Sequence, residues 1–110
     1  MSKFNDFIEL ILSGAVDLAR ETLGDVPDAA LADTREFIKF SKEELMSLTK
    51  DLKNKEITLD EFGELTRDLT HLAKLVALSD LGIVKTKLER FRTGLIDLVI
   101  NTAKTVFLPV

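Results

Sequence analysis

The residue pair with the clearest potential for chemistry is Asp68 and His71, three positions apart in the sequence. On a helix this spacing places a carboxylate and an imidazole on one face, and such pairs bind metal ions in four-helix bundles. The dinuclear form of that site needs two such histidines, and His71 is the only histidine of the chain. Helical projection also surrounds it with Glu64, Arg67 and Lys74. We therefore expect a solvent-exposed imidazole and no metal site.

A second candidate lies in residues 54–62, which resemble the end of an EF-hand calcium loop with Glu61 at its twelfth position. Calcium takes roughly six to eight oxygen ligands. The first and third ligand positions and the glycine position of the loop would here be Lys50, Leu52 and Lys55. Too few oxygens remain, so we expect no calcium binding.

Covalent and nucleotide chemistry also lack their necessary residues. The chain has no cysteine, which excludes thiol nucleophiles, disulfides and Cys-based zinc sites. A serine or threonine nucleophile needs a neighbouring base, and the only imidazole is expected in solvent. The five glycines are far apart and none precedes a Lys-Ser or Lys-Thr pair, so no phosphate-binding loop is present. We expect a non-enzymatic protein without catalytic residues or cofactors, and the absence of cysteine favours the cytoplasm.

Charge is unevenly distributed along the chain, whose formal net charge is −4. Residues 56–80 hold six acidic and two basic side chains, a net of −4, and residues 81–110 hold two acidic and five basic ones, a net of +3. These values predict that the two segments face each other, within one chain or between chains. The basic run Lys85, Lys87, Arg90 and Arg92 flanks an apolar row, as solvated charges commonly do. Since the chain is acidic overall, we expect no nucleic-acid partner.

The elements that must position these residues are predicted to be helical throughout. Leu, Ile, Val, Ala, Lys and Glu dominate the composition, and Pro and Gly are scarce. Apolar residues recur every three to four positions and predict helices over about residues 3–23, 28–53, 59–79 and 83–108, the last two either separate or continuous. Thr58 and Glu61 have the spacing of a capping box at the start of the third helix. We expect one all-α domain over residues 1–110, folded as a four-helix bundle.

The first and last helices have wider apolar faces than one neighbouring layer requires, which is a stripe of roughly 100°. Charged residues of the first helix fall within about 120° of arc, and the polar strip of the last is about 60° wide. Such faces imply either central positions in the bundle or contact outside the monomer, and we adopt the second interpretation. Apolar residues on the charged sides of the second and third helices add to this surface. The candidate interface residues are therefore Phe4, Phe7, Ile11, Phe40, Met46, Leu75, Leu78, Ile96, Val99, Ile100 and Phe107.

These faces lead to two expectations about function. The first is a non-enzymatic interaction or assembly module that forms a homo-oligomer or binds another protein, driven by burial of the surplus apolar side chains. The second is a bundle that binds a lipid or another apolar ligand at a membrane surface, where basic flanks would contact headgroups. No uncharged apolar run reaches about 18 residues, so no conventional membrane span is expected.

Overall fold

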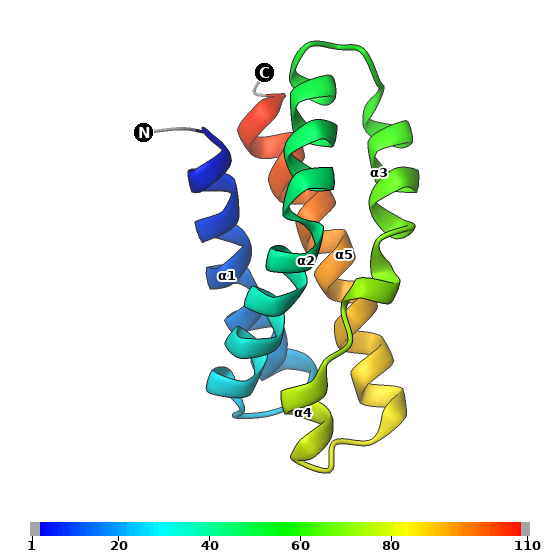
Figure 1. Cartoon of the computed structure of the whole chain (residues 1–110). Coiled ribbons are helices and arrows are strands. Elements are labelled where there is room, and N and C mark those ends of the chain that lie inside the picture. Colours follow the sequence, from blue (N-terminus) through cyan, green and yellow to red (C-terminus); the bar gives the residue numbers. More distant parts are fainter. Residues whose placement is uncertain (1–2, 109–110) are drawn as a thin grey trace.

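The computed structural model describes residues 3–108, which form a bundle of helices (Figure 1). The elements in chain order are α1 (Lys3–Thr22), α2 (Pro27–Lys53), α3 (Leu59–Arg67), the 3-10 helix η1 (Thr70–Leu72), α4 (Val76–Asp80) and α5 (Lys85–Phe107). The four longer helices run along the long axis of the molecule, and α4 lies at the end where α5 begins. The predicted all-α fold is confirmed. Within the described part of the chain no helix is long and apolar enough to cross a membrane.

The turn from α1 into α2 follows the local preferences of its residues. Gly24 has a φ of 95°, in the left-handed region that glycine adopts readily at helix ends. The amides of Leu23 and Gly24 both donate to the carbonyl of Ala19, which closes α1. Pro27 then begins α2, at a position where a helix has no use for an amide proton. The ends of α1 and α2 are therefore predictable to within one residue.

The wide apolar faces of α1 and α5 are explained by the central positions of these helices. α1 packs most extensively against α5 and also contacts α2, while α5 contacts α1, α2, α3 and η1. Our interpretation that these faces lack packing partners within the monomer is wrong, because each helix packs against more than one other helix. Of the candidate interface residues on α1 and α5, five are core residues: Phe7, Ile11, Ile96, Val99 and Phe107. Phe4 and Ile100 are partly buried against the core.

Two glycines allow α1 and α5 to approach closely. A Cβ atom built on Gly14 would lie 2.8 Å from Cδ1 of Leu98, and one built on Gly94 would lie 2.9 Å from Cδ1 of Leu18. Each glycine therefore faces a leucine of the opposite helix. This reciprocal arrangement gives the ends of both leucine side chains room at the contact between the two helices.

The predicted third helix over residues 59–79 is wrong, because the chain forms α3, η1 and α4 in its place. Leu75 has a φ of 56°, a left-handed conformation that is uncommon for a residue with a branched side chain. The side chain of Asp33, from α2, accepts hydrogen bonds from the amides of Ala77 at 2.9 Å and Leu78 at 2.8 Å. Asp33 thus caps α4 in place of a residue of its own segment.

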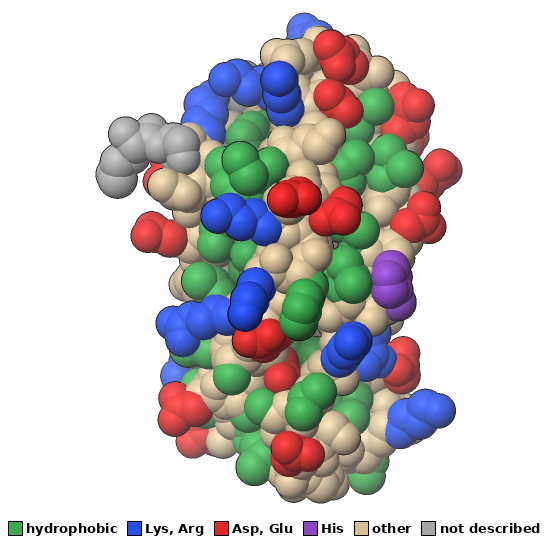
Figure 2. Space-filling view, viewed as in Figure 1, with side chains coloured by type: hydrophobic (Ala, Val, Ile, Leu, Met, Phe, Trp, Pro, Cys, Tyr) green, Lys and Arg blue, Asp and Glu red, His purple; other side chains and the backbone are tan. Residues whose placement is uncertain are grey.

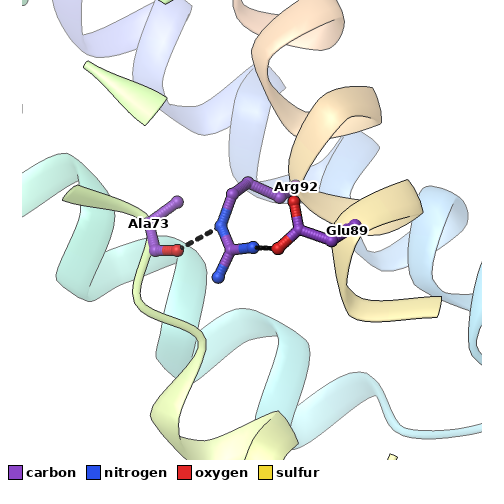
Figure 3. A network of polar contacts seen from close by, with 3 residues as sticks. All are labelled: Ala73, Glu89 and Arg92. Carbon is purple, nitrogen blue, oxygen red and sulfur yellow. Dashed lines mark hydrogen bonds and ion pairs between the residues drawn. The ribbon is translucent and has the colours of Figure 1, made fainter. Parts of the chain in front are cut away.

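A second long-range contact, made by a residue of α5, stabilises the same break (Figure 3). Nε of Arg92, from α5, donates to the carbonyl of Ala73 at 2.7 Å. The guanidinium also pairs with Glu89, one turn earlier on α5. Residues 81–84 then turn the chain into α5, with Gly82 at a φ of 80°, so the last two predicted helices are not continuous.

The break changes which residues face the core. A continuous helix would place Val76 on its apolar face and Leu75 and Leu78 on its charged side. Because the left-handed residue resets the helical rotation, Leu75 and Leu78 are buried and Val76 is 60% exposed. The two leucines that we expected at an interface are therefore core residues as well.

Candidate functional site

Asp68 and His71 are close in space but do not form the helical pair that their spacing predicts. α3 ends at Arg67, so Asp68 is its C-cap and His71 lies in η1. Nδ1 of the exposed His71 lies 2.9 Å from the backbone oxygen of Asp68, not from its carboxylate. Among residues 3–108, no three His, Cys, Asp or Glu side chains are grouped so that they could hold a metal ion.

The segment that resembles an EF-hand loop is an ordinary interhelical turn with a capping box. The amide of Glu61 donates to Oγ1 of Thr58 at 3.1 Å, and the amide of Thr58 donates to Oε1 of Glu61 at 2.9 Å. The Glu61 carboxylate, at the twelfth position of the supposed calcium loop, thus accepts a hydrogen bond from the N-cap residue of α3. The predicted capping box is confirmed.

The exposed apolar side chains lie mainly on α2 and on the segments packed beside it. Phe40 is 53% exposed and Met46 is 48% exposed, as their positions on the charged side of α2 predict. The sequence did not single out Leu65 on α3, which is 41% exposed, nor Val76 on α4. The other large exposed apolar side chains among residues 3–108 are Leu10 on α1 and Leu81 and Val84 in the turn before α5, so the larger group lies on α2, α3 and α4.

The first hollow on this surface lies between α2 and α3 and has a volume of about 450 Å³. Leu48 of α2, together with Leu65 and Leu69, supplies its apolar surface. Glu43 and Glu44 stand on the α2 side, and Asp68 stands on the opposite side. An apolar floor therefore lies between two acidic edges.

The second hollow continues along α2 toward α4 and has a volume of about 410 Å³. Phe40, Leu72 and Val76 are among its apolar lining residues. Its cation is Lys74, whose Nζ lies 5.9 Å from the centre of the Phe40 ring, within the range of a cation–π contact. The buried carboxylate of Asp33 also lines this hollow, but both of its oxygens are used to cap α4.

The two hollows lie one after the other along α2, and we call the surface that contains both of them the α2 groove. Its α2 residues recur every three to four positions from Ala32 to Leu48, so they share one helical face that borders α3, η1 and α4. The exposed carboxylates that line the groove are Glu36, Glu43, Glu44, Asp68 and Asp80, and the basic residue that lines it is Lys74. None of the ion pairs formed within residues 3–108 involves these five carboxylates. Figure 2 shows apolar side chains on this face with carboxylates close to them in its upper half, and with Lys and Arg side chains among them in its lower half. The groove can therefore bind an apolar surface that carries positive charge.

Half of the α2 groove could have been found from the sequence. Phe40 stands among Glu36, Glu43 and Glu44 at helical spacing, which indicates an acidic face with an exposed ring. The other half has no local signal, because Asp68 belongs to the end of α3 and Asp80 to α4, and only the tertiary fold places these elements beside α2.

Comparison of the chain with family models, with curated proteins and with solved structures finds no significant match.

Proposed function

We propose that this protein is a non-enzymatic interaction module that assembles with copies of itself, and that the α2 groove is its contact surface. One observation carries the proposal: the exposed Phe40 and Leu65 lie in a groove whose edges hold five carboxylates without ion-pair partners among residues 3–108. Exposed apolar surface with a polar rim is typical of protein interaction sites. The cytoplasm, expected from the absence of cysteine, remains part of this proposal.

The energetics favour a weak and salt-dependent association. Complete burial of a Leu or Phe side chain contributes about 1.5–3 kcal/mol, so covering the half-exposed Phe40 and Leu65 contributes roughly half of that for each. Association itself costs about 4–15 kcal/mol in lost freedom of motion. Two side chains are therefore insufficient alone, and attraction between the groove and a cationic surface must supply specificity and part of the binding energy.

Binding to a lipid surface is the alternative, and the geometry supports it less well. The apolar residues of α1 and α5 that would enter a bilayer interface are packed inside the bundle. The carboxylates of the α2 groove would repel anionic headgroups. A lipid-bound state would therefore require the bundle to open.

Sedimentation velocity of the full chain tests the proposal. We expect the weight-average sedimentation coefficient to rise as the protein concentration is raised from micromolar to millimolar. At a fixed high concentration it should fall when salt is added, because salt screens exposed charges. A monomer at every concentration in low salt would contradict self-assembly. Flotation with vesicles of phosphatidylcholine and phosphatidylserine separates the alternative: co-flotation of a chain that stays monomeric would favour the lipid surface.

A further inference from the structure

We propose that the α2 groove of one copy binds the corner between α4 and α5 of a second copy. We call this corner the basic corner and define it by Leu81, Val84, Lys85, Lys87 and Arg90. The inference rests on the proposed self-assembly and adds which two surfaces meet.

The groove supplies a predominantly negative surface, with Lys74 as the basic residue among those that line it. Glu43 and Glu44 on α2 and Asp68 across the first hollow belong to no ion pair formed within residues 3–108. Like charges on the two edges of one groove repel each other, most strongly at low ionic strength. A cationic group inserted between the edges removes that repulsion and gains attraction from both sides.

The basic corner is the complementary surface, and its own helix leaves it uncompensated. Val84 occupies the N-cap of α5 without a capping side chain, and no acidic residue stands in the first turn. Lys85 and Lys87 follow immediately, with Arg90 one turn later. Positive side chains are unfavourable at the positive end of a helix dipole, where carboxylates are stabilising. None of the ion pairs in the described chain involves these three residues.

The apolar parts of the two surfaces match as well. Leu81 is 58% exposed and Val84 is 59% exposed, so exposed apolar side chains accompany the basic ones at this corner. The groove offers Phe40 and Leu65 between its carboxylates. Contact between the surfaces therefore covers apolar residues on both sides while each lysine meets a carboxylate.

One chain cannot make this contact by itself. The corner lies at the end of the molecule that holds α4, whereas the first hollow lies farther along α2, beside α3 (Figure 1). A second copy must therefore provide the corner. Groove and corner adjoin through Val76 and Asp80 of α4, which line the second hollow. Two copies can then exchange corners about a two-fold axis, the commonest symmetry of protein dimers.

Reversing charges on each surface tests the pairing. The groove variant carries Glu43→Lys and Glu44→Lys, and the corner variant carries Lys85→Glu and Lys87→Glu, all at exposed positions. We expect each variant alone to dissociate at least tenfold more readily than the parent chain in sedimentation equilibrium at low salt. An equimolar mixture should regain parental affinity, because lysines in one groove then meet glutamates in the other corner.

Two controls separate this pairing from unfolding and from net charge. Acidic residues in the first turn of α5 suit the helix dipole, so the corner variant should melt no earlier than the parent chain. A further variant with Lys39→Glu and Lys42→Glu has the same net charge as the corner variant, but its altered residues lie outside the groove and the corner. It should associate at least threefold more tightly than the corner variant.

The outcomes distinguish this inference from the proposed function. A parent chain that remains monomeric overturns both. Charge-reversed variants that associate as tightly as the parent chain overturn only the pairing of groove and corner. A mixture of the two variants that fails to regain the parental affinity does the same. Binding of the monomeric parent chain, but not of the corner variant, to phosphatidylserine vesicles would assign the corner to a membrane and overturn the inference.

Discussion

Replacement of Asp33 should show how strongly α2 stabilises the break in the second half of the chain. The Asp33 side chain is only 6% exposed, and its two oxygens accept from two consecutive amides at the start of α4. The first amides of a helix have no partner within it. Leu75, at the N-cap of α4, has no oxygen in its side chain, so Asp33→Ala leaves the amides of Ala77 and Leu78 without acceptors.

The expected loss follows from the geometry of these two bonds. Hydrogen bonds to a charged group contribute about 1.5–3 kcal/mol each, but loss of a helix cap as a whole costs about 0.5–2 kcal/mol because water enters the vacated site. Since both bonds are near 2.8 Å and the carboxylate is buried, we expect Asp33→Ala to lower the free energy of unfolding by about 2–4 kcal/mol. Asp33→Asn retains one acceptor and should lose about half as much.

Urea unfolding monitored by circular dichroism measures the loss, with Glu36→Ala as the matched control. Glu36 is an exposed carboxylate one turn later on the same helix, and its removal should change stability by less than about 0.5 kcal/mol. Amide exchange locates the effect, because the amides of Ala77 and Leu78 should exchange faster in Asp33→Ala, relative to the global rate. An Asp33→Ala protein as stable as the control, or with unchanged exchange at these two amides, would refute the capping role.

Two further predictions concern the contact between α1 and α5. Phe7→Ala should destabilise the fold by about 3–5 kcal/mol, because Phe7 is fully buried and packs edge-on against Phe107 with ring centroids 5.5 Å apart; a loss below about 1 kcal/mol in urea unfolding would show that this ring is not a core residue. Gly14→Ala should change the free energy of unfolding by less than about 1 kcal/mol, because the nearest atoms that a Cβ would crowd belong to the end of the half-buried Leu98 side chain, which can move aside, and helix propensity rises by about 1 kcal/mol; a loss above about 2 kcal/mol in urea unfolding would show that the contact cannot adjust.

The predictable part of this fold is the part encoded by neighbours in sequence. Gly24 and Pro27 mark the turn between α1 and α2, and Thr58 with Glu61 marks the start of α3. Each of these signals acts over a few residues, so the periodic pattern and the caps suffice to place the helices.

The break after α3 could not be predicted, because no local residue produces it. The segment contains no glycine or proline from Glu64 to Leu81, and its apolar residues continue a helical repeat. The alternative path is stabilised by Asp33, which is 44 residues away from Ala77, and by Arg92, which is 19 residues away from Ala73. Tertiary contacts of this kind override local propensity. The half of the α2 groove that lies outside α2 could not be predicted for the same reason.

The interpretation of wide apolar faces failed for a related reason. A helical wheel gives the angular width of the apolar surface but not the number of neighbouring helices. Ile11 and Val99 are buried because α1 and α5 pack against each other near the centre of the bundle. The pattern was consistent with both central helices and an external interface, and only the topology distinguishes them.

The pairing of α1 with α5 has a consequence for how the chain acquires its fold. Since α1 precedes α5 in the chain, it leaves the ribosome before its most extensive partner, and residues 23–84 separate the two. At roughly 5–20 residues per second, translation leaves the apolar side of α1 without that partner for several seconds. Contacts between such distant segments also slow the search for the native state, compared with bundles whose successive helices pair. Newly made chains should therefore depend on α2, which is made before α5 and which α1 also contacts extensively, to shield α1 from aggregation.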